Sequence, residues 1–279
     1  FNLDYIDIML DLIKNLNKTQ KLNIMIGIPA YGGTIQTGFT QSLLELQKIF
    51  LELNINYYLH WITGESLIPR ARNSIISKFH NDRQYTHLFF IDTDITFKVE
   101  TFLNLLLTNL ELCGVSYPKK SINWGRVRHL VKNDADDLTL YNSMSDMNYN
   151  LEYKKNKKGI YLNKLGGFVE SKDCPTGFML IKRIVVDLLV LNYPELEYKN
   201  NVSGYGNDFK FYDFFKCGVV DKIYLSEDYY FCHLCKKIGI QLFLDTDSTL
   251  VHSGKMDFYG CLKNFLHGDK YNADVNIMR

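Results

Sequence analysis

Apolar residues recur along the chain in two periods, and segments of the two kinds alternate. Short apolar runs occur at residues 23–29, 55–62 and 87–91. Between the first two runs, apolar residues recur every three or four positions over 37–53, and residues 69–79 are predicted as another helix. Unbroken runs are typical of buried strands, whereas the wider spacing indicates an amphipathic helix. The alternation predicts an α/β fold with a Rossmann-like, mostly parallel central sheet flanked by helices.

The rest of the pattern predicts a polar excursion followed by a second ordered half. Residues 119–165 are rich in Lys, Asn and Asp, so we expect a long irregular segment that acts as a mobile lid. Residues 174–183 are predicted as a strand opened by a Pro-Thr-Gly turn, followed by an apolar helix to Leu191. A helix is predicted over 226–239, with Ser226 as its N-cap. A further strand and a loop complete this half.

Composition excludes several classes of protein. The chain has 279 residues, is 46% hydrophobic and carries a net charge of +1, so it can bury one large core and has no global field for nucleic acid. No run of about 18 apolar residues is present to span a bilayer, and we expect a soluble protein. Six cysteines are too sparse for a disulfide framework. Cys232 and Cys235 lack a second pair for zinc and are predicted to be plain thiols.

Candidate chemistry is concentrated where the third predicted strand ends. The stretch HLFFIDTDITF places Asp92 and Asp94 directly after an apolar run. In parallel α/β sheets, ligands bind beyond the carboxyl ends of the strands, so these carboxylates lie where a ligand is expected. Two carboxylates at this spacing can share Mg²⁺ or Mn²⁺, or one can bind the ion while the other orients a ribose. The alternative is that either aspartate caps the following turn.

The order of elements and motifs resembles the GT-A class of glycosyltransferases, which use nucleotide-sugar donors. The resemblance covers residues 22–255 and rests on FFIDTDITF, SLIPRARNSII, CPTGFMLIKR, and SEDYYFCHLC with the downstream VHSG. The clustering of these motifs is also similar to glycosyltransferases of large DNA viruses, some of them associated with collagen-like proteins. The resemblance implies one GT-A-like domain over 1–279, with a nucleotide-binding half at 22–118 and an acceptor-side half at 165–260.

The resemblance also implies roles for individual residues. Asp92, Asp94 and His252 would hold Mn²⁺ or Mg²⁺, and Asp92 would also lie near the ribose. Glu227 and Asp228 would lie beside the acceptor, where inverting members carry their catalytic base. The donor-binding residues expected from the sequence are Pro29, Ala30, Tyr31, Arg70, Asn73, Asp92 and Trp124.

Each assignment has a structural alternative. Glu227 and Asp228 are also favourable in the first turn of any helix, because they complement its dipole. Arg70 fits a solvated helix start, and His252 fits an ordinary loop. Trp124, within the polar excursion, is either a lid residue that stacks on a sugar or a local packing anchor.

The predicted function is metal-dependent transfer of a hexose, with glucose the leading guess, from a UDP-sugar to a glycan or glycosylated protein. The viral resemblance suggests galactosyl-hydroxylysine of a collagen-like protein as the acceptor, and the cytoplasm of a host cell or a viral factory as the location. Neither nucleic acid nor a membrane span is expected. One alternative is a haloacid-dehalogenase-like phosphatase, since FFIDTDIT and LFLDTDST both fit its first motif, in which the first aspartate is a nucleophile. A non-catalytic nucleotide- or carbohydrate-binding module is the other. The second Asp-Thr-Asp is assigned to the acceptor side or to structure.

Overall fold

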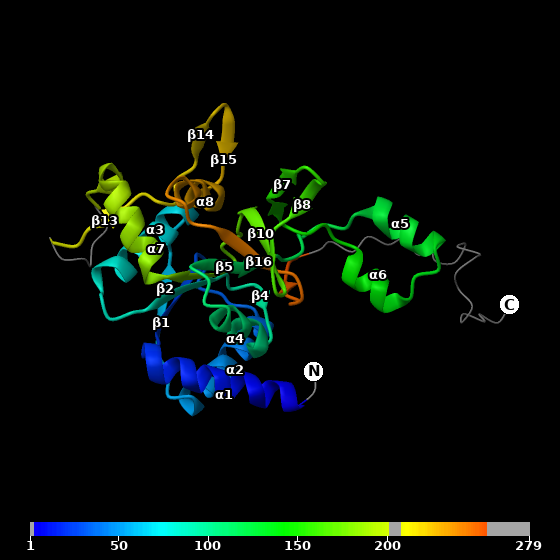
Figure 1. The fold of residues 1–279 in the computed structure, drawn as a ribbon, viewed down its shortest axis with the longest axis horizontal. Helices are drawn as coiled ribbons and strands as arrows, with labels where there is room; N and C mark the ends of the chain where they lie inside the picture. Colours follow the sequence, from blue (N-terminus) through cyan, green and yellow to red (C-terminus); the bar gives the residue numbers. More distant parts are fainter. Residues whose placement is uncertain (1–2, 201–207, 256–279) are drawn as a thin grey trace.

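A computed structural model describes residues 3–200 and 208–255 as an α/β fold built on one large sheet (Figure 1). In the described chain this sheet has nine strands. In spatial order they are β2 (Asn56–Thr63), β1 (Asn23–Ala30), β3 (His87–Ile91), β11 (Phe178–Lys182), β5 (Leu112–Val115), β16 (Leu242–Asp245), β10 (Phe168–Asp173) and β6 (Asn150–Leu151), with β9 (Lys164–Leu165) also paired to β10.

The core of the sheet is mostly parallel, which confirms the predicted fold class. Strands β2, β1 and β3 pair in parallel, and so do β5 and β16. The reversed strand β11 lies between β3 and β5, so Met179 is paired with both Phe90 and Gly114. The position of Gly114 requires glycine, because a Cβ there would lie 2.6 Å from the carbonyl oxygen of Phe178.

Two hydrophobic cores cover the two faces of the sheet. One lies under α1 (Leu3–Gln20), α2 (Thr37–Glu52) and α4 (Val99–Leu107), and the other under α3 (Ile68–Asn81), α7 (Arg183–Asn192) and α8 (Glu227–Lys237). Successive residues of β1 alternate between them: Ile24 and Ile26 belong to the first core and Met25 to the second. Burying each such side chain contributes roughly 1.5–3 kcal/mol, so the two cores hold the strand ends in fixed positions.

The elements predicted in the first half of the chain are confirmed within two residues at each end. The strand predicted over 174–183 is confirmed as β11, Phe178–Lys182, and the predicted turn lies directly before it at Thr176 and Gly177. None of the described helices combines the length and apolar character needed to span a lipid bilayer.

The excursion at 119–165 is not irregular, and that prediction was wrong. It contains two helices and a hairpin: α5 (Trp124–Lys132), α6 (Asp137–Ser143), and β7 (Tyr153–Asn156) paired with β8 (Gly159–Leu162). Neither helix has a buried side chain, which explains why apolar periodicity did not reveal them. Side-chain caps from Asn123 and Asp136 begin the two helices instead. Both helices project from the body of the protein (Figure 1).

Short strands complete the described chain. They are β4 (Ile95–Thr96), β12 (Glu197–Tyr198), β13 (Phe211–Tyr212), β14 (Gly218–Val220), β15 (Ile223–Leu225) and β17 (Val251–His252). The pairing of β17 with β4 matters most for the site, because His252 is opposite Ile95. In addition, the backbone N–H of Ser253 donates to the carbonyl oxygen of Asp94 at 2.8 Å. A segment from the end of the chain is thereby held against the turn after β3.

Candidate functional site

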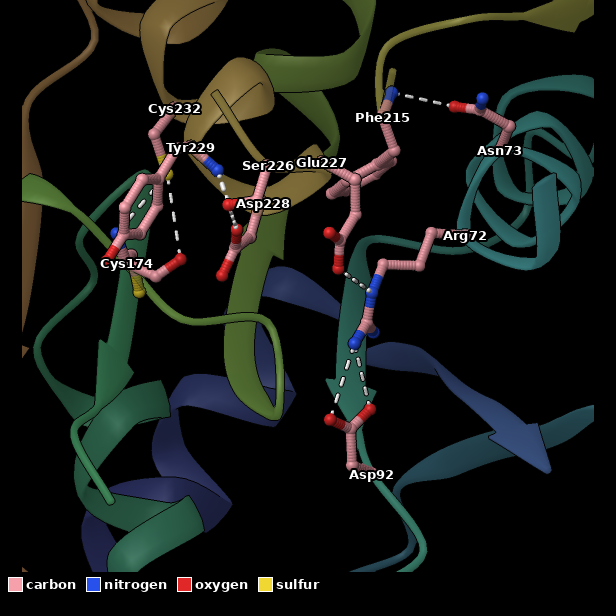
Figure 2. Close-up of polar contacts among 10 residues, drawn as sticks. All are labelled: Arg72, Asn73, Asp92, Cys174, Phe215, Ser226, Glu227, Asp228, Tyr229 and Cys232. Atoms are coloured by element: carbon pink, nitrogen blue, oxygen red, sulfur yellow. Dashed lines mark hydrogen bonds and ion pairs between the residues drawn. The ribbon is translucent and has the colours of Figure 1, made fainter. Parts of the chain in front are cut away.

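Asp92 lies at the carboxyl end of β3 and is held by an arginine. The chain makes a tight turn there, since the N–H of Ile95 donates to the carbonyl oxygen of Asp92 at 3.1 Å. Figure 2 shows Nη2 of Arg72 directed at both carboxylate oxygens of Asp92, at 3.0 and 3.3 Å. The two carboxylate oxygens of Asp92 therefore face a fixed positive charge, the guanidinium of Arg72 on α3.

Arg72 also connects Asp92 to the helix on the other side of the site. Its Nε lies 3.4 Å from Oε1 of Glu227, at the start of α8 (Figure 2). The guanidinium is 3% exposed, and its Nη1 has no hydrogen-bond partner in the described structure. Burial alone would lower the pKa of Arg72, but the carboxylates of Asp92 and Glu227 outweigh burial and raise it. Arg72 is thus a permanent positive charge that fixes two carboxylates.

The sequence did not single out Arg72. In SLIPRARNSII, Arg70 and Arg72 are two residues apart and so face different sides of the helix. Only one of the two arginines can face the sheet, and the sequence alone does not show which one does. The presence of two arginines in the first turns of a helix that follows a strand was the available signal.

Asp94 is held by residues from two other segments. Lys120, from the loop after β5, forms an ion pair with Oδ2 of Asp94. Nε2 of His252 lies 3.5 Å from Oδ1, which makes no hydrogen bond in the described structure. Burial acts to raise the pKa of Asp94, but the interactions with His252 and Lys120 outweigh it and lower the pKa to about 2.

The ring of His252 is fixed by its other nitrogen. Nδ1 lies 2.8 Å from the carbonyl oxygen of Pro118, which can only accept, so Nδ1 carries the hydrogen. The ring of Tyr117 packs edge-on against the imidazole, with 5.0 Å between ring centroids. With Nδ1 turned to this carbonyl, Nε2 faces Oδ1 of Asp94.

This arrangement fits a hard divalent cation. A carboxylate oxygen without a hydrogen bond and a ring nitrogen face each other, and metal-binding histidines commonly donate their second N–H to a backbone carbonyl. Asp94 and His252 would supply two ligands, while ligand oxygens and water would supply the others. Within the described residues, no group of three or more His, Cys, Asp or Glu side chains converges as a metal site. Asp92 faces Arg72, so the structure brings two of the three predicted metal ligands together.

The side chains of the predicted donor-binding residues differ in how far they are already paired within the protein. Arg70 forms a bidentate pair with Glu65 at 2.5 and 2.9 Å. Asn73 points away from Asp92, and its Oδ1 accepts from the N–H of Phe215 at 2.8 Å (Figure 2). Its Nδ2 donates to Asp213 at 2.7 Å. The amide of Asn73 is thus used within the protein.

Pro29 and Ala30 end β1, next to the same edge of the sheet. Tyr31, which follows them, is 67% exposed. Trp124 is 60% exposed at the first residue of α5, so it is not a buried packing anchor. Both aromatic side chains are accessible to a ligand.

The start of α8 carries the predicted acceptor-side pair. Oδ1 of Asp228 accepts from the hydroxyl of Ser226 and, at 2.9 Å, from the N–H of Tyr229 (Figure 2). Ser226 is the N-cap residue as predicted, but its side chain makes no capping bond because it donates to Asp228. No contact in the described structure occupies Oδ2 of Asp228. That oxygen is available to a ligand, whereas Glu227 is paired with Arg72.

The second Asp-Thr-Asp, at the end of β16, is a local structural turn. Asp245 accepts from the N–H groups of Asp247 and Ser248 at 2.8 and 3.3 Å, and from the Ser248 hydroxyl at 2.6 Å. Asn104 of α4 donates to it as well, at 2.9 Å. Of the two roles predicted for this motif, the structural one fits these contacts.

Two cavities in the described surface lie away from Asp92 and Asp94. One of about 430 Å³ is lined by lysines and asparagines where α1 and α2 end. Cationic side chains offset the partial negative charge of helix C-termini, which accounts for these lysines. The other, of about 290 Å³, lies between α4 and the second Asp-Thr-Asp turn. Neither of these two cavities is lined by Asp92 or Asp94.

Comparisons with known proteins give the following results. A scan against protein-family models finds no match, and neither does a search of curated proteins. Among solved structures, the chain is similar to A197 from STIV, with 14% sequence identity, a TM-score of 0.41, and coverage of 86% of this chain and 98% of that chain. It is also similar to GalNAc-T7 with UDP, GalNAc and Mn²⁺, with 10% identity, a TM-score of 0.40, and coverage of 85% of this chain and 44% of that chain. Similarities this low carry no information about activity.

Proposed function

We propose that this protein is a metal-dependent glycosyltransferase that uses a nucleotide-sugar donor. The observation that carries the proposal is the pairing of Asp94 with His252. A carboxylate oxygen without a hydrogen bond faces a ring nitrogen whose orientation is fixed by Pro118. This pair lies at the carboxyl end of a strand in an α/β sheet, where ligands of such sheets bind.

In the proposed reaction, Asp94 and His252 hold Mn²⁺ or Mg²⁺. The ion supplies positive charge for the diphosphate that leaves with the nucleotide. Asp92, fixed by Arg72, accepts a hydrogen bond from a hydroxyl of the donor. Both oxygens of Asp92 accept from Arg72, whereas Oδ1 of Asp94 has no hydrogen bond and faces His252, so we assign the cation to Asp94 and His252 and not to Asp92.

The acceptor side is assigned to the start of α8. Oδ2 of Asp228 is open, so Asp228 is the residue able to remove a proton from an acceptor hydroxyl in an inverting reaction. Glu227 has a different part, since its pairing with Arg72 ties α8 to the donor side. The exposed rings of Tyr31 and Trp124 are assigned to base and sugar stacking.

The finer identity of the substrates extends the proposal. UDP-glucose is the proposed donor, and a glycan or glycosylated protein, with galactosyl-hydroxylysine first, is the proposed acceptor. A single domain carrying a donor half and an acceptor half fits this division of labour. The phosphatase alternative needs Asp92 as the nucleophile, whereas the charge of Asp92 is paired with the buried guanidinium of Arg72, which makes the carboxylate a poorer nucleophile.

Calorimetry and a donor screen test the proposal. We expect UDP to bind with Mn²⁺ present and to bind far more weakly in EDTA; equal affinity in both would remove the metal from the site.

UDP-hexoses are then offered with galactosyl-hydroxylysine, free sugars and unmodified peptides, and UDP release is measured. Hydrolysis of p-nitrophenyl phosphate without turnover of any nucleotide sugar would support the phosphatase. Asp228→Asn should keep UDP binding and lose transfer, and a variant with full transfer would make Asp228 structural.

A further inference from the structure

Lys120 is the cation that the protein itself provides for Asp94. Its ammonium group pairs with Oδ2, while His252 faces Oδ1 of the same carboxylate. The stem of Lys120 lies against Gly254, where an added Cβ would come within 2.9 Å of the lysine Cδ. The loop that carries Lys120 is fixed before it by the contact of Pro118 with His252 and by the N–H of Lys119 donating to the carbonyl oxygen of Asp146 at 2.7 Å. After Lys120, the N–H of Asn123 donates to the carbonyl oxygen of Met144 at 2.8 Å.

Without a ligand, the negative charge of Asp94 is balanced by the positive charge of Lys120. Asp94 and Lys120 together carry no net charge. A divalent cation between Asp94 and His252 adds two positive charges next to the ammonium group, and like charges a few ångströms apart repel. A nucleotide diphosphate carries roughly three negative charges near neutral pH, which compensates both the ion and the lysine.

We infer that Lys120 binds the diphosphate and makes cation binding depend on the nucleotide. Lys120 weakens the affinity of Asp94 and His252 for a divalent cation alone. The same lysine strengthens the binding of a nucleotide diphosphate when the cation is present, because its ammonium then pairs with a phosphate oxygen. The two ligands are thus coupled through one side chain, and the coupling is reciprocal. The inference rests on the proposed nucleotide-sugar function.

The adjacent lysine provides a matched control. Lys119 is exposed and makes no side-chain contact with Asp94, so Lys119→Met removes the same charge from the same loop. Calorimetry of Mn²⁺ alone, and of UDP at saturating Mn²⁺, is performed on wild type, Lys120→Met, Lys120→Arg and Lys119→Met.

We expect Lys120→Met to tighten Mn²⁺ binding alone about tenfold and to weaken UDP binding with Mn²⁺ about tenfold. Lys119→Met should match wild type in both measurements, and Lys120→Arg should keep the coupling because it keeps the charge. Uridine, which lacks phosphates, should bind wild type and Lys120→Met equally.

Other outcomes overturn the inference in distinguishable ways. If Lys120→Met weakens both Mn²⁺ and UDP binding, the lysine only holds the loop in place. If Lys120→Met and Lys119→Met both behave like wild type, Lys120 contributes nothing to either ligand. Both of these results leave the proposed function intact. If wild type itself binds neither UDP nor Mn²⁺, the proposed function fails and the inference fails with it.

Discussion

The tripeptide Asp-Thr-Asp occurs twice, at 92–94 after β3 and at 245–247 after β16, and the two copies are held in opposite ways. In the first copy, the partners come from distant segments: Arg72 on α3, Lys120 after β5 and His252 in β17. In the second, most hydrogen bonds to Asp245 come from residues two and three positions later in the same turn. The same tripeptide at the end of a strand is therefore part of the candidate site at 92–94 and a locally bonded turn at 245–247.

The residues that follow each tripeptide account for the difference. Ser248 follows the second copy, and its N–H and hydroxyl satisfy Asp245 locally. Ile95 and Thr96 follow the first copy and form β4, which pairs with β17; the N–H of Ile95 donates to the main-chain carbonyl of Asp92, not to its carboxylate. A carboxylate that its own turn satisfies has no capacity left for a ligand, whereas one held by long side chains does.

The largest expected effect comes from Asp94→Asn. We expect transfer to fall about a thousandfold, because the charge that faces the leaving diphosphate is no longer anchored. Asp247→Asn makes the same chemical change at the same place in the second copy and should stay within about twofold of wild type, as expected for a turn residue. The measurements are rates of UDP release and melting temperatures. Equal losses in both variants would mean that the two copies share one role.

Removal of Arg72 tests whether the first copy depends on a distant side chain. Arg72→Met should lower the free energy of unfolding by about 3 kcal/mol, because the carboxylates of Asp92 and Glu227 lose their shared buried cation. Arg70→Met breaks a more exposed pair and should cost less than about 1 kcal/mol. Urea denaturation of both variants makes the comparison. A similar cost for the two arginines would contradict the assignment of Arg72.

The smallest effect is expected at the second copy. Asp245→Ala should lower the free energy of unfolding by about 1 kcal/mol, since the N–H groups of its turn lose their acceptor. Asp245→Asn should cost less, because an amide oxygen can accept the same bonds. UDP binding measured by calorimetry should be unchanged in both variants. A loss of UDP affinity would move the second copy into the ligand site.

The sequence predicted those parts of the protein that depend on local periodicity. The strands up to β3 and helix α2 follow from apolar runs and spacing, whereas α8 follows from its end signals, with Ser226 as N-cap and Gly239 as its stop. The reversed insertion of β11 did not follow, because a short apolar run carries no information about its direction or neighbours. Helices α5 and α6 were missed since they bury no side chain.

The site was predictable as a list of residues but not as an arrangement. Asp92, Asp94, His252 and Asp228 could be singled out from motifs, and all four lie at or near the carboxyl edge of the sheet. Which arginine of the Arg-Ala-Arg segment turns inward, and which of two adjacent lysines reaches Asp94, depend on packing between segments far apart in the sequence. The contact of Arg72 with Asp92 and the contact of Lys120 with Asp94 determine which carboxylate oxygens remain without a hydrogen bond and can bind a cation.

The short ribbon of β4 and β17 has a consequence for the order in which the protein acquires its function. His252 is opposite Ile95 in this ribbon, so the segment after residue 250 must reach back across most of the chain to complete the site. During synthesis, β1 to β3 and the helices between them are available to fold long before that segment leaves the ribosome. Contacts between residues so distant in sequence form late, because closing a long loop is entropically costly. A nascent chain can therefore carry the folded strand and both aspartates while it still lacks the imidazole, and it becomes competent to hold a cation only at the last step of its folding.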